Sequence, residues 1–123
     1  MTRTVHLDRT MTQADFDAFA RLSGDANPIH VDPDFAARTR FGKTVAHGAF
    51  LCAILRGLVD ELAPGGTQKN QAVMFPNSAP VGETVRFEAR IIDTDAGRSA
   101  IALTAIRLSD GKPACEGRTD VET

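Results

Sequence analysis

The sequence predicts an α+β fold in which an antiparallel sheet wraps around one long apolar helix. The first observation is the stretch from His47 to Leu62, which is apolar or small at nearly every position. Such a pattern is typical of a helix that the rest of the fold covers on most sides. The second is the change after Pro64-Gly65-Gly66, where the apolar residues pass from helical spacing to alternation with short turns between segments.

The part of the chain before the apolar helix is expected to hold a short strand and short helices. Residues 1–9 alternate as a strand does. Thr12 is a suitable helix N-cap and Gly24 a suitable helix end, so the segment between them is predicted to be a helix. Asp32 and the proline after it predict the start of another short helix, over residues 34–39.

Four strands are expected after the apolar helix, joined by short turns. The Asp110-Gly111 pair is a hairpin signal and separates the last two strands. Such a sheet keeps a free edge, and the helix is too apolar for one small sheet to cover entirely. The sequence therefore predicts a homodimer, or a larger homo-oligomer, with self-complementary contacts. The expected strands are residues 71–75, 84–93, 99–108 and 114–121.

Length and composition indicate one globular domain over residues 1–123. Hydrophobic residues make up 42% and charged residues 24%, which excludes a disordered or fibrous chain. The 14 basic and 16 acidic residues are mixed along the chain, so neither nucleic acid nor a membrane surface is an expected partner. The first residues lack the apolar core of a signal peptide and no segment has the length of a membrane span, so a cytoplasmic location is expected.

Both cysteines, Cys52 and Cys115, lie within apolar segments. No other cysteine or histidine stands near either one at the spacing of metal ligands, so we interpret them as buried, reduced thiols. The sequence therefore predicts neither a disulfide nor a metal site, and no cofactor is expected.

The stretch with the most functional information runs from Ser23 to Ala36. It places a carboxylate, Asp25, five residues before an imidazole, His30, and both residue types are used in general acid–base catalysis. Pro28 prevents one continuous helix, so the two side chains cannot be placed by counting helical faces. A turn at Asn27-Pro28 can bring both within hydrogen-bond reach of a common atom, so the spacing permits a pair without proving one. Either residue alone would more often have a structural role.

The segment from Gly24 to Pro33, with Ala36 and the later Ala46-His47-Gly48, resembles the signature of the MaoC-like, (R)-specific enoyl-CoA hydratase family. The resemblance covers most of the chain, because strand, helix, loop, apolar helix and antiparallel strands follow in the family's order. It implies a hot-dog fold, with the sheet wrapped around the central helix. It also implies reversible syn addition of water to a trans-2-enoyl thioester of coenzyme A, which gives the (R)-3-hydroxyacyl thioester.

Three residues match the family's catalytic groups. In the scheme that the resemblance implies, His30 removes a proton from water as general base, and Asp25 helps to deliver a proton to the α-carbon. The amide of Gly48 matches the family's oxyanion hole. The sequence supports this role independently, because Gly48 opens the apolar helix, where amides lack an internal partner, and has no Cβ to keep a thioester oxygen away.

Asn27 is expected to act mainly by shaping the loop through hydrogen bonds to the backbone. His47, directly before Gly48, is expected to be a structural or pocket-lining group rather than a catalytic one. The full set of candidate substrate-binding residues is Asn27, His47, Phe50 and Phe75.

Two features depart from the family pattern. A small hydroxyl residue is common about two turns into the apolar helix, where this chain has Arg56. If Arg56 faced Asp25, it would hold that residue as a carboxylate and weaken it as a proton donor, which makes it a candidate modulator of the site. The loop over residues 75–83 also differs, so the sequence leaves the acyl chain length open.

Two other functions remain open at this point. A hot-dog thioesterase would need an activating carboxylate along the central helix, but Asp60 and Glu61 lie near its end. A non-catalytic acyl-CoA binding module would keep the pocket without the chemistry, and Arg56 is the feature that favours it. Three basic residues ahead of the helix either meet coenzyme A phosphates or are solvated charges: Arg38, Arg40 and Lys43.

Overall fold

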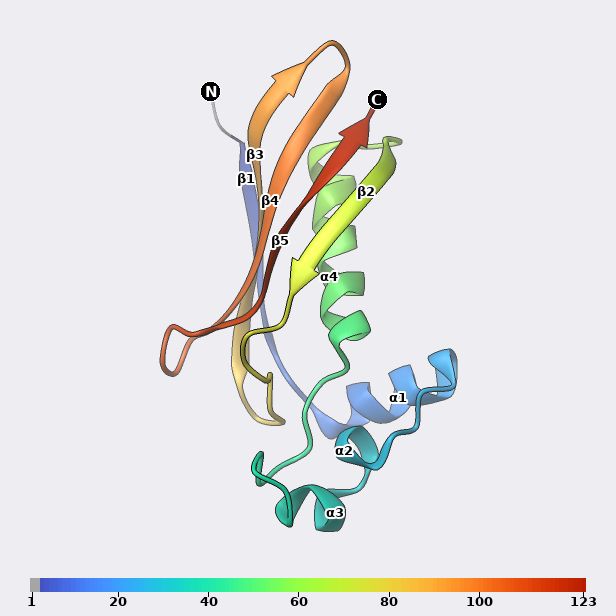
Figure 1. Cartoon of the computed structure of the whole chain (residues 1–123), viewed down its shortest axis with the longest axis vertical. Helices are drawn as coiled ribbons and strands as arrows, with labels where there is room; N and C mark the ends of the chain where they lie inside the picture. Colours follow the sequence, from blue (N-terminus) through green and yellow to red (C-terminus); the bar gives the residue numbers. More distant parts are fainter. Residues whose placement is uncertain (1–2) are drawn as a thin grey trace.

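A computed structural model describes residues 3–123 of the chain, so the first two residues of the expected N-terminal strand lie outside it (Figure 1). One antiparallel sheet contains five strands in the order β1-β3-β4-β5-β2. The strands are β1 (Thr4–Thr10), β2 (Thr67–Met74), β3 (Thr84–Asp95), β4 (Arg98–Arg107) and β5 (Pro113–Glu122). The helices are α1 (Gln13–Ser23), α2 (Pro28–Val31), α3 (Pro33–Ala37) and α4 (Gly48–Leu62).

The helix α4 packs along one face of the sheet, which confirms the predicted α+β arrangement (Figure 1). Its sheet-facing side is buried against β3, whose alternate residues Val85, Phe87 and Ala89 point into the core. Burying one large apolar side chain such as Phe87 contributes roughly 1.5–3 kcal/mol, so this contact is a substantial part of the core. The buried residues of α4 are Phe50, Leu51, Leu55, Leu58, Val59 and Leu62.

One side of α4 is left uncovered in the isolated chain. Ala49, Ala53 and Gly57 recur at every fourth position and are all exposed. The prediction that the rest of the fold covers most of this helix is therefore confirmed for its sheet-facing side only, because the five strands reach around part of its circumference.

The short helices α1, α2 and α3 lie together beyond one end of the sheet, beside the start of α4 (Figure 1). The predicted caps of α1 are confirmed: Thr12 accepts from the amide of Asp15, and Gly24 ends the helix with a φ of 83°. Asp32 caps α3, which ends at Ala37, two residues before the predicted end. The one-turn helix α2 was not expected; it forms because a proline at its first position loses no helical hydrogen bond.

The strand predictions are confirmed to within two residues at each end, except at the start of β1, which is Thr4, and at the start of β2. This strand begins at Thr67, because its first residues pair with β5 through backbone and polar contacts such as Asn70 to Asp120. The side chains of this edge strand are mostly exposed, so apolar and polar residues need not alternate along it. The sequence pattern therefore did not predict where the strand begins. None of the helices in residues 3–123 has the length and apolar character needed to cross a membrane.

Candidate active site

The local fold of the loop after α1 sets the position of Asp25. The left-handed backbone of Gly24 ends α1, so Asp25 leaves the helix and faces solvent, with its side chain 55% exposed. Its Oδ1 atom accepts from the amide of Asn27 at 3.2 Å. Asn27 then accepts from the amide of Ile29 at 3.1 Å and caps α2, which carries His30. Asn27 therefore shapes the loop that presents both groups.

A backbone hydrogen bond orients the imidazole of His30. Its Nδ1 atom lies 2.8 Å from the carbonyl oxygen of Val45. Because a carbonyl oxygen only accepts, Nδ1 carries the hydrogen, and the lone pair of the neutral ring is on Nε2. That Nε2 atom lies 3.9 Å from Oδ2 of Asp25. The basic nitrogen of the ring therefore faces the carboxyl group, as a general base beside an acid requires.

The separation of 3.9 Å between the two groups is too long for a direct hydrogen bond and suits a small molecule beside both. A water at about 2.8 Å from each atom would hydrogen-bond to Asp25 and His30 at once. The His30 side chain is 14% exposed, so solvent reaches the pair from the Asp25 side. The geometry can hold and activate one water molecule.

His47 connects this pair to the start of α4. Its ring stacks on that of His30, with centroids 3.8 Å apart and planes 22° apart. Its Nε2 atom donates to the backbone carbonyl of Asp25 at 2.9 Å, since the carbonyl only accepts. The residue is 2% exposed, and its Nδ1 atom has no partner among the described residues. Gly48 follows directly, so the catalytic candidates and the helix N-terminus share one cluster.

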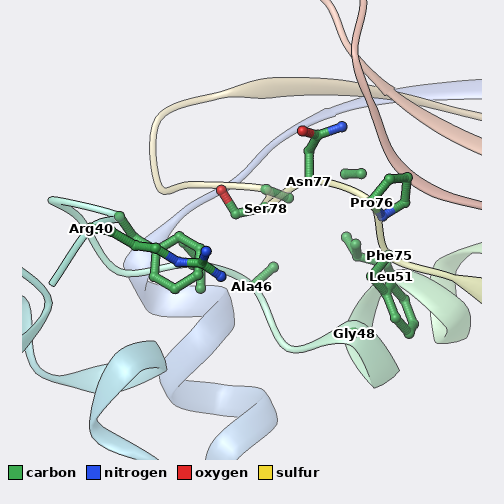
Figure 2. Close-up of a pocket in the computed structure, with 12 residues that line it drawn as sticks. Arg40, Ala46, Gly48, Leu51, Phe75, Pro76, Asn77 and Ser78 are labelled. Atoms are coloured by element: carbon green, nitrogen blue, oxygen red, sulfur yellow. The ribbon is translucent and has the colours of Figure 1, made fainter.

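The amide of Gly48 is free to bind a ligand atom. Gly48 is the first residue of α4, and none of the hydrogen bonds described for residues 3–123 uses its N–H. Unpaired amides at this end of a helix, together with the helix dipole, favour negative charge. Gly48 also lines a cavity of about 400 Å³ (Figure 2). Asp25 and His30 do not line this cavity; His30 adjoins it through its hydrogen bond to the carbonyl of Val45, which does line it.

Gln13 holds the segments of the site together, and the sequence gave no sign of this. Its Nε2 atom donates to the carbonyl of His30 at 2.9 Å, and its Oε1 atom accepts from the hydroxyl of the buried Thr44 at 2.6 Å. One side chain of α1 therefore fixes α2 and the strand-like segment before α4. The contacts join residues distant in sequence, so only the folded chain shows them.

The remaining candidates lie at different depths. Phe50 is 9% exposed and packs edge-on against Phe16 and Phe19 in the core. Phe75 lies on the loop after β2 and lines the cavity. Arg56 forms an ion pair with Asp60, one turn further along α4, with Nη1 and Oδ1 3.1 Å apart. The angles at these two atoms are too bent for a hydrogen bond.

The side chains of Asp25, His30 and His47 offer ligand atoms within 4.8 Å of one another, which is the spacing of a candidate metal site. A metal bound by histidine lies in the plane of the ring, at about 2.0–2.1 Å from nitrogen for zinc. The two rings are stacked at 3.8 Å and tilted by only 22°, so no single ion lies in both planes at that distance. In this arrangement the trio does not form a three-ligand metal site.

Comparison with known proteins agrees with the fold. Residues 1–110 match the family model described as the MaoC like domain. An (R)-specific enoyl-CoA hydratase of Aeromonas caviae is 32% identical over 101 residues, which cover 82% of this chain and 68% of that protein. The 3-hydroxyacyl-thioester dehydratase Z of Mycobacterium tuberculosis is 33% identical over 117 residues, which cover 86% of this chain and 78% of that protein. The solved structure of an (R)-hydratase from A. caviae involved in PHA biosynthesis matches with a TM-score of 0.90 at 28% identity. The match covers 98% of this chain and 93% of that one.

Proposed function

Because the chain belongs to the MaoC-like domain family, we propose that it catalyses the reversible hydration of a trans-2-enoyl-CoA thioester to the (R)-3-hydroxyacyl thioester. One observation carries this proposal. His47, directly before Gly48, bonds to the backbone of Asp25 and stacks on His30, so an acid, a base and a free helix-terminal amide lie in one cluster. The activities in the names of the relatives agree with it, as does the hot-dog arrangement of sheet and central helix.

The acid and the base act on the two carbons of the double bond. His30 takes a proton from the water through Nε2 while the water oxygen bonds to the β-carbon, and Asp25 in its protonated form gives a proton to the α-carbon. The two groups lie side by side, so hydroxyl and proton arrive at the same face, which is syn addition. The reaction leaves the proton on His30, and transfer to Asp25 restores the starting state. Each group typically contributes ~10²-fold to ~10⁴-fold in rate.

The amide of Gly48 stabilises the negative charge that develops on the thioester oxygen. This charge is larger in the enolate-like transition state than in the bound substrate, so the donor accelerates the reaction rather than only tightening binding. The dipole of α4 adds to the effect, because the oxygen meets the positive end of a helix of 15 residues. The scheme needs no metal or cofactor, since side chains activate the water.

The other candidates take supporting roles in this proposal. Asn27 and His47 position the pair. Phe50, in the first turn of α4, holds the helix in place through its core contacts with Phe16 and Phe19, and Phe75 contacts the substrate in the cavity. Among the described residues, Arg56 forms its ion pair with Asp60 rather than with Asp25.

The proposal includes a homodimer, or a larger homo-oligomer, in the cytoplasm. The exposed side of α4 and the free edge at β2 are the surfaces that a second copy would cover. The two cysteines are free, as is typical of a reducing compartment. Light scattering after size-exclusion chromatography tests the oligomeric state.

The activity is tested by mixing the purified protein with crotonyl-CoA. Loss of the ultraviolet absorbance of the conjugated thioester reports hydration, and chiral chromatography of the product reports the stereochemistry. We expect absorbance loss with formation of the (R)-product. Release of free thiol without hydration would instead indicate a thioesterase, and saturable binding without either reaction would indicate a binding module.

A further inference from the structure

We propose, on the basis of the hydratase function above, that Phe75 is the specificity-determining residue that limits the length of the acyl chain. Its ring packs against the backbone of Gly48: a Cβ built on Gly48 would lie 2.9–3.1 Å from three atoms of this ring. In Figure 2 the side chain of Phe75 stands beside the first turn of α4, at the edge of the cavity. The ring therefore borders both the amide that binds the thioester oxygen and the space open to the rest of the acyl group.

The position of Phe75 is unusual for a large aromatic side chain. It is 48% exposed, although burial of such a ring is favourable. The neighbouring Met74 is 59% exposed and does not line the cavity. Phe75 therefore differs from Met74 in its contact with Gly48 and the cavity, not in its exposure.

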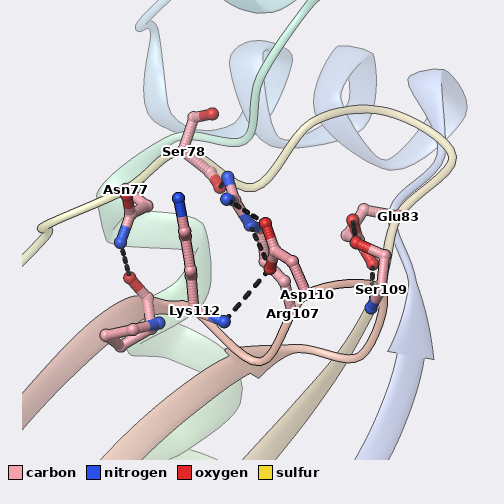
Figure 3. A network of polar contacts seen from close by, with 8 residues as sticks. Asn77, Ser78, Glu83, Arg107, Ser109, Asp110 and Lys112 are labelled. Atoms are coloured by element: carbon pink, nitrogen blue, oxygen red, sulfur yellow. Dashed lines mark hydrogen bonds and ion pairs between the residues drawn. The ribbon is translucent and has the colours of Figure 1, made fainter.

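The loop that carries Phe75 is held by polar contacts from the β4–β5 hairpin (Figure 3). Arg107 donates to the carbonyl of Ser78 at 3.1 Å and is itself fixed by a two-point contact with Asp110. Asn77 donates to the carbonyl of Pro113 at 2.9 Å. Two anchors within three residues of Phe75 keep its backbone in place, so the ring forms a defined wall rather than a mobile flap.

Part of the cavity suits hydrocarbon, although Arg40, Asn77 and Ser78 also line it. Its inner wall includes Leu51 and Ala114, both buried. One of the two N–H groups of the Asn77 side chain is already used for the hairpin, which leaves fewer donors for the amides of a pantetheine arm, whose burial without partners would be costly. At about 400 Å³ the cavity is near the lower end of ligand pockets, about 300–1,000 Å³, which favours short acyl chains. In this proposal a longer chain would meet the Phe75 ring, which lines the cavity beside Gly48.

The test compares crotonyl-CoA with trans-2-decenoyl-CoA as substrates of the wild type, Phe75→Ala and Phe75→Leu, with Met74→Ala as the matched control. We expect Phe75→Ala to raise the decenoyl-to-crotonyl ratio of kcat/KM at least about 10-fold, and Phe75→Leu to raise it less. Met74→Ala should keep the wild-type ratio. A Phe75→Ala ratio equal to that of Met74→Ala, or an equal loss of activity toward both substrates, would overturn the proposal.

A binding measurement separates this inference from the hydratase function. Titration calorimetry with butyryl-CoA and decanoyl-CoA needs no reaction, so it works on a protein that hydrates nothing. If Phe75→Ala shifts the affinity ratio toward decanoyl-CoA in a protein without hydratase activity, the proposed function fails and the role of Phe75 stands. If the wild type hydrates crotonyl-CoA and neither ratio changes in Phe75→Ala, the role of Phe75 fails alone.

Discussion

The imidazole of His47 stacks on that of His30, with ring centroids 3.8 Å apart. His47 is buried and its Nε2 atom donates to the backbone carbonyl of Asp25 at 2.9 Å, so its ring is held in place against that of His30. The stack and the bond from His47 to Asp25 make His47 a positioning residue: it touches both catalytic candidates and lies between them and α4.

Replacement of His47 separates its two contacts. Phenylalanine keeps a stacking ring but leaves the Asp25 carbonyl without its donor, whereas glutamine keeps a donor and loses the stack. An unsatisfied, partly buried carbonyl costs about 1–3 kcal/mol, so we expect kcat of His47→Phe to fall roughly 5-fold to 150-fold with little change in KM. His47→Gln should retain more activity. Steady-state kinetics check this, with the exposed His6→Gln as control; equal activity of the two His47 variants would contradict the role of the hydrogen bond.

Substitution of Gly48 by alanine should reduce hydration at least about 100-fold, because a Cβ keeps the thioester oxygen from the amide. The added methyl group would also meet the ring of Phe75, so the single variant alone is ambiguous. The double variant Gly48→Ala with Phe75→Ala resolves this, since it leaves room for the methyl group. We expect the double variant to stay inactive in the crotonyl-CoA assay. Recovery to the level of Phe75→Ala would mean that Gly48 serves packing and not the oxyanion.

The contact between Arg107 and Asp110 predicts a pH dependence of stability. The hydrogen bond from Arg107 is the main cause that lowers the pKa of the Asp110 carboxyl, with the amide of Lys112 contributing. A carboxyl with a lowered pKa in the folded state adds stability above its unfolded pKa, and this is lost as the pH falls through the folded value. Urea midpoints of the wild type and Asp110→Asn should therefore differ at pH 7 and converge below about pH 4. A constant difference across this range would contradict the assignment.

The prediction of buried thiols is confirmed for Cys115, whereas Cys52 is only partly buried, and both thiols should react slowly in the native protein. Burial is the main cause that raises the pKa of Cys115 to about 12, and burial also raises the pKa of Cys52. The thiolate is the reactive form, and at pH 8 about one in ten thousand Cys115 thiols would be ionised. Ellman's reagent should react slowly with the native protein and rapidly with two thiols in urea. Fast reaction of Cys115 in the native state would contradict its buried, protonated state.

The sequence predicted the elements whose signals are local. The cap at Thr12, the end at Gly24 and the apolar span of α4 each depend on a few neighbouring residues, and the structure agrees with them. The start of β2 could not be predicted, because Thr67 and the polar residues after it are held by pairing with β5 rather than by an apolar face.

In the candidate site too, local features could be predicted from the sequence, whereas contacts between distant segments could not. Asp25 and His30 could be singled out from one short segment, but their 3.9 Å separation depends on the turn of α2, which a single proline only suggests. The contact of His47 with that pair, and that of Phe75 with Gly48, join segments far apart in sequence. Periodicity and spacing carry no information about such contacts, so they required the structure.

The most direct measurement is the initial rate of crotonyl-CoA hydration by Asp25→Asn and His30→Gln. Asp34→Asn and His6→Gln serve as controls, since both replace exposed residues of the same types outside the site. Each catalytic variant should lose at least about 100-fold in kcat while keeping the wild-type melting temperature, and the controls should keep full activity. Hydration by either catalytic variant at the rate of its control would contradict the assignment of Asp25 and His30 as the acid and base.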